Sequence, residues 1–525
     1  MQTISPADLT RLFDSASEWA LLDVRETAEA DAGHIYGATF LPRRMLELRL
    51  PELVPDRSTT LVMYDEGGTR AMRAAHAADA AGYRDVRVLE GGLRAWQAAG
   101  LKLSSGSNVP SKLFGETVYE HQHVPQLPAE VLHGWQHEGK PHVVCDIRTP
   151  DEYRVGRIPG AHGAFGVDVA LVAADLKARH VPVVVHCAGR TRSIIACQTL
   201  RELGVDEVYA LENGTMGWQL AGYELERDAP GRMLTPTPES VDEAATRTRD
   251  LARSAGADAV DAAKLRAWLE RRAQGAMNLY LFDVRQVAAY EAGHIAGSKA
   301  LPGGLAIQRT DEFIAVRNAH VVLVDDDEAR AWMTAFWLKG MGFPHVHVLQ
   351  GGIRAWLAAG ASVETGRPRP EALLLAEKRK HTRYVSPTEL AAELAGESRP
   401  CVIDVDTSRY FSQGHVAGAH WLPYGWLEDR IDAVAGPHAR IVLTCHNGIH
   451  STYAGSNLVA MGYSDVRVLE GGMAKWKKIG LPVDHGLPVD ATEDIVLPPY
   501  AADRATMARY LEWEQRLTRE REQAR

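Results

Sequence analysis

The 525-residue sequence has few cysteines and no long apolar stretch. Its five cysteines are sparse and odd in number, which argues against a disulfide framework and favours reduced thiols. No run of about 18 apolar residues is present, so we expect no transmembrane helix. The first residues, MQTISPADLT, lack the basic and then apolar pattern of a secretory signal. We therefore expect a cytoplasmic protein without a membrane partner.

The sequence also lacks an excess of positive charge. It carries 58 Lys and Arg against 68 Asp and Glu, for a formal net charge of −10. Because binding to phosphate backbones requires clustered Lys and Arg, we do not expect nucleic acid as a partner. The 46% apolar and 24% charged residues are typical of globular proteins, and the length predicts roughly three to five domains.

Three sequence patterns recur four times in the same order. The first is an apolar strand ending in Asp, followed by a helical stretch and a Gly-(His/Arg)-(Ile/Val) turn. The second is an apolar strand that leads through a short loop into a helix. The third, as in LEGGLRAWQAAG from Leu89, is a glycine turn before a helix that carries a Trp. We expect these Trp side chains to pack their helices on a sheet, at Trp96, Trp218, Trp356 and Trp476.

Strands that alternate with helices predict an α/β fold, here four tandem domains, each a small parallel sheet flanked by helices. Ser5 and Ser386, each followed by Pro, are the predicted N-caps of the first helices in two of the domains. Pro-, Ser- and Gly-rich stretches predict linkers at 104–112, 228–240 and 365–372. The predicted domains are 1–104, 126–230, 259–365 and 380–486, and a helical tail at 487–525 is assigned no chemistry.

The loops after the second strand differ among the four repeats. The second repeat reads CAGRTRS from Cys187, and the fourth reads CHNGIHS from Cys445. The first and third repeats have Asp65 and Asp325 at the same place. Ligands of α/β folds bind at the carboxyl ends of strands, so these loops are the candidate sites.

Cys187 has the surroundings of an activated nucleophile. The N-terminus of the following helix, together with Arg190 and Arg192, favours the thiolate, and free backbone N–H groups can cradle an anion. The alternative interpretation is a buried, inert thiol. We favour that core interpretation for Cys145, Cys197 and Cys401.

The Asp-x-Arg strand ends, the Gly-His-Ile turns, the CAGRTRS loop and the LEGG…Trp endings resemble the rhodanese (thiosulfate sulfurtransferase) family over nearly the whole chain outside the linkers and the tail. The resemblance implies that Cys187 takes the outer sulfur of a donor such as thiosulfate, releases sulfite and passes the sulfur from a persulfide to an acceptor. It implies no cofactor, and the histidine pairs of the sequence have no evident third ligand for a metal ion. The predicted catalytic residues are Cys187 and Cys445, and the predicted substrate-binding residues are Ala188, Gly189, Arg190, Thr191, Arg192, Ser193, Arg148, His446, Asn447, Gly448, Ile449 and His450.

Many rhodaneses pair an inactive domain with an active one that follows it, and this chain resembles that pair occurring twice. Asp65 and Asp325 cannot form a persulfide, so the first and third domains are predicted to be inactive. We hypothesise that these aspartates pair with Arg70 and Arg330 and close the empty loops, although they could also be solvated loop acids.

The fourth loop departs from the family pattern at two positions. His450 stands where the second loop has Arg192, and Asp406 stands where the second domain has Arg148. Because two fixed positive charges are missing, we predict that Cys445 is a weaker or more pH-sensitive nucleophile than Cys187, or prefers a less anionic donor.

Two alternative functions remain open. Phosphatases and arsenate reductases share the fold, but their loop has five residues between Cys and Arg, whereas four separate Cys187 from Arg192. The chain could also be a sulfur-relay or persulfide-carrier scaffold that needs a protein partner. We expect a small-molecule donor and acceptor, with a protein as a further candidate acceptor. Thiosulfate is the favoured donor, because the longer loop of family members that use mercaptopyruvate is absent.

Overall fold

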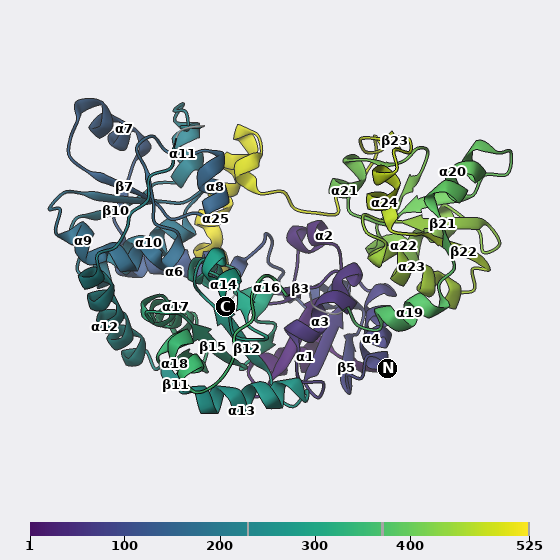
Figure 1. Cartoon of the computed structure of the whole chain (residues 1–525), viewed down its shortest axis with the longest axis horizontal. Coiled ribbons are helices and arrows are strands. Elements are labelled where there is room, and N and C mark those ends of the chain that lie inside the picture. Colours follow the sequence, from purple (N-terminus) through teal and green to yellow (C-terminus); the bar gives the residue numbers. More distant parts are fainter. Residues whose placement is uncertain (228–229, 369–371, 523–525) are drawn as a thin grey trace. The chain divides into compact units, whose positions relative to one another are not determined.

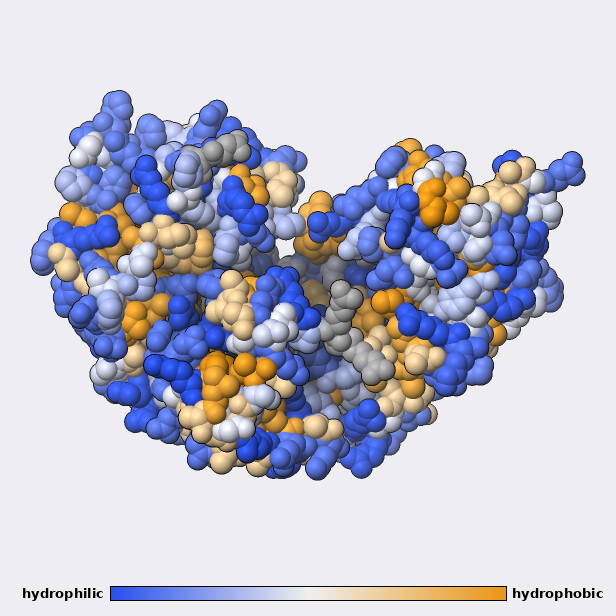
Figure 2. Space-filling view, viewed as in Figure 1, coloured by the Kyte–Doolittle hydropathy of each residue, from blue (hydrophilic) through white to orange (hydrophobic). Residues whose placement is uncertain are grey.

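The computed structural model describes residues 1–227, 230–368 and 372–522 (Figure 1). Residues 228–229 and 369–371 of two predicted linkers, and residues 523–525 of the predicted tail, lie outside the described residues. Four sheets of parallel strands with flanking helices follow one another along the chain, which confirms the predicted fold class. On the face shown in Figure 2, hydrophilic residues predominate and apolar residues form scattered patches.

The first sheet has the strand order β1-β5-β4-β2-β3, with all pairs parallel. Its first helix begins as predicted, because Ser5 Oγ accepts a hydrogen bond from the Asp8 amide at 3.1 Å. The elements are β1 Gln2–Ile4, α1 Pro6–Phe13, β2 Trp19–Asp23, α2 Thr27–Ala32, β3 Thr39–Phe40, a 3₁₀ turn Arg43–Met45, α3 Leu46–Leu53, β4 Thr60–Tyr64, α4 Arg70–Ala80, β5 Asp85–Leu89 and α5 Gly92–Ala98.

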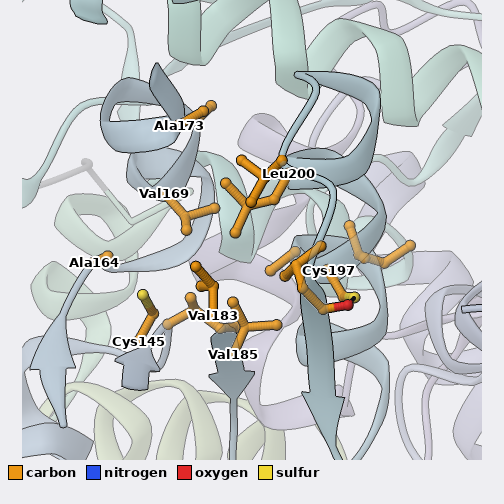
Figure 3. Packing of buried hydrophobic residues seen from close by; sticks show 14 of the residues in the cluster. Cys145, Ala164, Val169, Ala173, Val183, Val185, Cys197 and Leu200 are labelled. Carbon is orange, nitrogen blue, oxygen red and sulfur yellow. Dashed lines mark hydrogen bonds between the residues drawn. The ribbon is translucent and has the colours of Figure 1, made fainter. Parts of the chain in front are cut away.

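The second sheet has the order β6-β10-β9-β7-β8. Side chains of β7 and β9 pack against α10 in the core of this domain, where Cys145, Val183, Val185 and Cys197 lie in one apolar cluster (Figure 3). The elements are β6 Gln126–Leu127, α7 Ala129–Glu138, β7 Val143–Asp146, α8 Pro150–Val155, β8 His162–Gly163, a 3₁₀ segment Gly166–Val172, α9 Ala173–Lys177, β9 Val183–His186, α10 Thr191–Glu202, β10 Val208–Leu211 and α11 Gly214–Leu220.

The third sheet has the order β11-β16-β15-β12-β13. Its central strand β15 is buried except at its first residue, as the apolar sequence HVVLVD predicts. The elements are β11 Asp258–Val260, α13 Ala262–Ala273, β12 Leu279–Asp283, α14 Val287–Ala292, β13 Lys299–Ala300, α15 Gly303–Gln308, α16 Thr310–Phe313, β14 Val316–Arg317, β15 His320–Val324, α17 Ala329–Gly340, β16 Val346–Leu349 and α18 Gly352–Ala358.

The fourth sheet has the order β17-β22-β21-β18-β20. Ser386 caps its first helix together with Glu389 in a reciprocal capping box, as predicted. The elements are β17 Tyr384–Val385, α20 Pro387–Ala395, β18 Cys401–Asp404, α21 Ser408–Ser412, β19 His415–Val416, β20 His420–Trp421, α22 Tyr424–Arg430, a 3₁₀ turn Ile431–Ala433, β21 Arg440–Thr444, α23 Ile449–Ala460, β22 Asp465–Leu469, α24 Gly472–Lys478 and β23 Val483–Asp484.

The four repeated Trp side chains pack in the cores, as predicted. Each is at most 6% exposed. Each indole N–H donates to the backbone carbonyl six residues further along the chain. The aromatic ring therefore joins its helix both to the sheet and to the chain that leaves the domain.

The connections between domains contain helices that the linker predictions did not include. These are α6 Val109–Gln122, α12 Pro238–Ser254 and α19 Leu375–His381, and a 3₁₀ turn Pro499–Ala501 and helix α25 Arg504–Glu522 follow the fourth domain. In α12, the Thr237 side chain caps the first turn, and Ala244, Thr248 and Ala252 form a buried face. Spacings of four residues place such positions on one side of a helix.

The chain forms two compact units. The domains that each unit contains are not the pairs, first with second and third with fourth, that the order of the repeats suggests. One unit contains Met1–Ser107 and Arg369–Val496, and the other contains Asn108–Pro368 and Leu497–Arg525. The first domain is thus paired with the fourth, and the second with the third. Each pair still combines one aspartate loop with one cysteine loop.

Polar contacts join the two domains within each unit. In the first unit, Asp429 accepts hydrogen bonds from Thr69 Oγ1 at 2.6 Å and from Arg73 Nη1 at 2.5 Å. In the second unit, Asp168 accepts from Arg330 Nε at 2.6 Å and from Gln286 Nε2 at 2.7 Å. In both units an aspartate of the cysteine domain therefore binds polar side chains of the aspartate domain.

Candidate active site

In every domain, the loop after the second apolar strand is held by the glycine turn of the LEGG pattern. In the second domain, the Thr215 amide donates to the Cys187 carbonyl at 2.9 Å. Gly214 has φ of +56°, and a Cβ atom there would lie 2.3 Å from that carbonyl oxygen, so only glycine fits. The same close approach joins Gly92 to the Asp65 carbonyl, Gly352 to the Asp325 carbonyl and Gly472 to the Cys445 carbonyl.

Cys187 lies between the end of β9 and the first turn of α10 and is 2% exposed. Its Sγ atom lies 3.5 Å from Ser193 Oγ, and that hydroxyl donates to the Arg190 carbonyl at 2.8 Å. Cys187 also contributes to the apolar cluster with Val185 and Ile194. The sulfur therefore lies at the base of the loop and has little access to solvent.

The two arginines of this loop are paired with carboxylates. Arg190 forms two hydrogen bonds of 2.8 Å with Glu116 on α6. Arg192 forms bonds of 2.8 and 2.9 Å with Glu152 on α8, and although burial alone would raise the pKa of Glu152, Arg192 lowers it to about 2. Both guanidinium groups are thus largely neutralised, and their contact with substrate stays a prediction.

Arg148 holds the strand end in place. Its guanidinium donates to the Asp146 carboxylate at 2.6 Å and to the Gly156 carbonyl at 2.6 Å. The equivalent arginines Arg25 and Arg285 make the same contacts in their own domains. The observed role of Arg148 is therefore structural, and its predicted role in binding substrate is not tested by these contacts.

The remaining residues of the second loop contact helices α11 and α25. The Ala188 carbonyl accepts a hydrogen bond from the Met216 amide at 3.0 Å. At Gly189, a Cβ atom would lie 3.0 Å from Met216 Cε and 3.3 Å from Glu514 Oε2, which explains the need for a small residue. Thr191 donates to Glu514 Oε1 from both its amide and its hydroxyl, at 3.3 and 2.5 Å.

In the aspartate loops, the backbone amides bind the carboxylate of the loop's own aspartate. Asp65 Oδ1 accepts from the Gly67 and Gly68 amides at 2.7 and 2.9 Å, and Oδ2 accepts from the Ala71 amide at 2.9 Å. The carboxylate is therefore an internal anion that fills the ring of amides. The hypothesis that Asp65 pairs with Arg70 is wrong, because Arg70 binds Glu29 instead, at 2.7 Å.

In the third domain, the hypothesised pair is present. Asp325 lies 3.0 Å from Arg330 Nη1 and accepts hydrogen bonds from the Asp326 and Arg330 amides at 2.8 and 2.9 Å. Burial raises the pKa of Asp325, which Arg330 opposes. Asp325 is 1% exposed and Asp65 is 4% exposed, so neither is a solvated loop acid.

In the Cys187 loop, the amides equivalent to those that bind Asp65 belong to Gly189, Arg190 and Ser193. Among the residues that the structure describes, none of these three amides has a hydrogen-bond acceptor. The cysteine side chain carries no carboxylate that could satisfy these amides as Asp65 does. Amides without an acceptor at the start of a helix are the type of group that binds an anion.

Cys445 has a different electrostatic environment. Its Sγ atom lies 3.4 Å from the Ser451 amide and 3.3 Å from Ser451 Oγ, whereas Asp406 accepts from the next amide, that of His446, at 2.7 Å. Burial and the charge of Asp406 raise the pKa of Cys445 to about 11. Burial also lowers the pKa of His450, so this ring does not replace the charge of an arginine at neutral pH.

The missing arginine also affects the neighbouring aspartate. Asp404 is the equivalent of Asp146 but faces Asp406 instead of a guanidinium, and burial raises the pKa of Asp404 to about 7. The other predicted residues of the fourth loop shape its turn. The His446 ring lies 4.8 Å from that of Tyr410, Asn447 Oδ1 accepts from the Ile449 amide at 3.0 Å, and Gly448 has φ of +84°.

Glu116 and Glu514 were not predicted from the sequence, although both are 2% exposed beside the second loop. They lie on α6 and α25, outside the recurring patterns. A signal was present in the tail, because Met507, Leu511 and Glu514 follow one another at helical spacing. A single acidic residue on such a face does not reveal which loop it contacts.

The other three cysteines lie within β7, α10 and β18 and not in the loops. Burial raises the pKa of both Cys145 and Cys197 to about 12, and Cys401 is half-buried in β18 with a raised pKa. Among the described residues, no group of three or more His, Cys, Asp or Glu could hold a metal ion. No helix within the described part of the chain is long and apolar enough to cross a membrane.

Known proteins similar to this chain include thiosulfate sulfurtransferases. A crystal structure of thiosulfate sulfurtransferase from Pseudomonas aeruginosa is 35% identical, with a TM-score of 0.88, and the match covers 99% of this chain and 97% of that chain. Thiosulfate sulfurtransferase from Azotobacter vinelandii is 30% identical over 223 residues, which is 38% of this chain and 78% of that protein. Thiosulfate sulfurtransferase GlpE from Pseudomonas putida (strain GB-1) is 33% identical over 91 residues, 17% of this chain and 82% of that protein.

The model of the rhodanese-like domain matches four segments, at residues 5–99, 128–221, 261–359 and 386–479. Each segment contains one of the four parallel sheets and one of the four loops. Because these segments together make up well over half of the sequence, the chain belongs to the rhodanese-like domain family.

Proposed function

We propose that this chain is a sulfurtransferase that moves a sulfane sulfur from thiosulfate, or a related donor, to a thiophilic acceptor, with Cys187 as the nucleophile. The observation that carries the proposal is the ring of amides. The Asp65 carboxylate occupies it in the first domain, whereas the equivalent amides beside Cys187 have no acceptor among the described residues. A nucleophilic sulfur and a place for an anion therefore occur together.

The proposed reaction has two steps. The Cys187 thiol first loses its proton to water, and the thiolate attacks the outer sulfur of thiosulfate. The bond between the two thiosulfate sulfurs breaks, sulfite leaves with the electron pair, and a cysteine persulfide forms. An acceptor such as cyanide then attacks the outer sulfur of the persulfide, which forms thiocyanate and returns the Cys187 thiolate. No net oxidation occurs.

The role of the loop in this reaction follows from charge. The N-terminus of α10 and its free amides stabilise the thiolate and then the terminal sulfur of the persulfide. Arg192 remains close enough to Cys187 for its positive charge to act on the thiolate, although the pairing with Glu152 neutralises part of that charge. Cys445 is proposed as a second and weaker site, and the Asp65 and Asp325 domains as non-catalytic partners of the two cysteine domains.

Intact-mass measurement tests this assignment. After exposure to thiosulfate, the wild-type chain and the Cys445→Ser variant should each gain one sulfur atom that maps to Cys187. The Cys187→Ser variant should gain far less. A sulfur that maps to neither cysteine, or no gain together with hydrolysis of aryl phosphates, would refute the proposal.

The two aspartate loops, which cannot carry a persulfide, favour a second candidate, in which the protein relays sulfur to a protein acceptor. At 2% exposure, the thiol cannot meet a large partner without movement of the surrounding helices. Turnover with free thiosulfate and cyanide separates the two functions, because a relay would load once and then stall until its partner is added. The cytoplasmic location stays a prediction.

A further inference from the structure

Helix α25 covers the Cys187 loop within the second unit, and Figure 1 shows this helix in yellow against the second domain. Met507 and Leu511 pack on Met216, the residue whose amide binds the Ala188 carbonyl. Further along the helix, Thr518 donates to Glu120 of α6 at 2.8 Å. The cover is therefore anchored on both sides of the loop.

Glu514 is the residue of this cover that contacts the loop. Its Oε1 atom accepts hydrogen bonds from the amide and the hydroxyl of Thr191, the first residue of α10. Its Oε2 atom is buried and has no hydrogen-bond partner among the described residues. That oxygen lies 3.3 Å from the position of a Cβ atom on Gly189. A buried carboxylate oxygen without a partner is costly, so its position beside the loop requires an explanation.

The aspartate loops supply that explanation. In the first and third domains, a carboxylate from within the loop satisfies the amides at the start of the helix. In the second domain, the carboxylate arrives from outside, on α25, and takes the Thr191 amide. Glu514 thus places a negative charge at the N-terminus of α10, where the anionic group of a sulfur donor would be stabilised.

We propose that Glu514 is a specificity-determining residue of the Cys187 site, because its carboxylate competes with the anionic donor for the N-terminus of α10. This inference rests on the proposed function of Cys187. The negative charge of Glu514 beside the loop weakens the binding of an anionic donor more than that of a neutral reagent.

The first test compares two isosteric changes on the same helix. Glu514→Gln removes the competing charge, whereas Glu512→Gln changes an exposed position as the matched control. In the full chain, the first variant should lower the KM for thiosulfate by about tenfold, the size of one charge-assisted hydrogen bond, with little change in kcat. The control should match the wild type. Equal KM values in all three proteins would overturn the proposal.

The second test does not depend on sulfur transfer. Iodoacetate is an anion and iodoacetamide is neutral, and both alkylate thiolates. At Cys187, Glu514→Gln should raise the ratio of the iodoacetate rate to the iodoacetamide rate by about tenfold, and Glu512→Gln should leave it unchanged. A residue that only stabilised the helix would change both rates by the same factor, and that result would also refute the proposal.

A third variant separates the effect of the Glu514 charge from the effect of helix α25 covering the loop. Leu511→Ala loosens α25 on Met216 but keeps the Glu514 carboxylate, so both alkylation rates should rise together while their ratio stays close to that of the wild type. If Glu514→Gln does not fold, Leu511→Ala takes its place as the test. A rise in the iodoacetate rate of Leu511→Ala without a rise in its iodoacetamide rate would then contradict the role assigned to Glu514. If the ratio changes as expected but no persulfide forms at Cys187, the proposed function fails while the position of Glu514 remains supported.

Discussion

The second and fourth domains have the same fold and the same spacing from strand to cysteine to helix, yet the charged groups around the two sulfur atoms differ. Beside Cys187, the strand end carries Arg148 and the loop carries Arg192, each paired with a carboxylate. Beside Cys445, Asp406 stands in the place of Arg148, and its amide donates a hydrogen bond to Asp404 Oδ1 at 3.0 Å. From this difference we expect that the loop backbone alone does not make a cysteine reactive, since burial and the charge of Asp406 raise the pKa of Cys445 in the same backbone setting.

The largest expected effect concerns which of the two cysteines carries activity. Cys187→Ser should reduce thiocyanate formation by at least about a thousandfold, because serine forms no persulfide. Cys445→Ser is the matched control and should lower the rate by less than about half. Similar losses in the two variants would contradict the proposed ranking of the two sites.

The next effect is the pH dependence of Cys445 in the Cys187→Ser background. Because burial and Asp406 raise the pKa of Cys445 to about 11, only a small fraction is thiolate at neutral pH. Its alkylation rate by iodoacetamide, mapped by mass spectrometry, should rise roughly tenfold per pH unit between pH 7 and 9 without a plateau. A plateau below pH 9 would show that the sulfur is stabilised as a thiolate by some other group.

A smaller effect is expected from restoring the missing charge. Asp406→Arg should pair with Asp404 as Arg148 pairs with Asp146, and should lower the pKa of Cys445. We expect its alkylation rate at pH 7.5 to rise by about tenfold, with a parallel gain in persulfide loading from thiosulfate. Asp406→Asn is the control, since it removes the negative charge without adding a positive one and should give an intermediate rate. An unchanged rate in both variants would show that the charge at position 406 does not control the reactivity of Cys445.

The smallest effect on activity concerns the aspartate loops. Asp65→Ala removes the acceptor of three amides and should lower the free energy of unfolding by about 2 kcal/mol, while thiosulfate turnover at Cys187 stays the same. Chemical denaturation with a parallel activity assay measures both quantities. Asp65→Asn, which keeps an acceptor, should recover part of the stability. A loss of turnover in Asp65→Ala would give the first domain a role beyond support.

The arginine at the strand end shows where reasoning from sequence succeeded only in part. The recurrence of Asp-x-Arg marked the end of β7 and its equivalents correctly, because a strand with a charged end has a clear sequence pattern. That pattern could not show that Arg148 turns back to Asp146 and Gly156. The direction of a long side chain depends on how the strand end and the following turn fold around it, which the residue pattern does not give.

The pairing of domains illustrates the same limit. Four repeats in a row suggested neighbouring pairs, but the first domain is joined to the fourth and the second to the third. The contacts involved, such as Arg73 with Asp429 and Arg330 with Asp168, lie between residues more than 150 positions apart. Each is a charged pair of a kind that many other residues in the sequence could form.

The sequence by itself determined the four α/β domains, the glycine turns, the buried Trp side chains and the two candidate nucleophiles. These features follow from local periodicity, from backbone conformations that only glycine adopts, and from the chemistry of single side chains. The tertiary structure alone decided which carboxylate neutralises each arginine, what fills each ring of amides, and that α25 places Glu514 against Thr191. Those outcomes depend on long-range packing, which sets how deeply each charged group is buried and therefore how strongly it interacts with its neighbours.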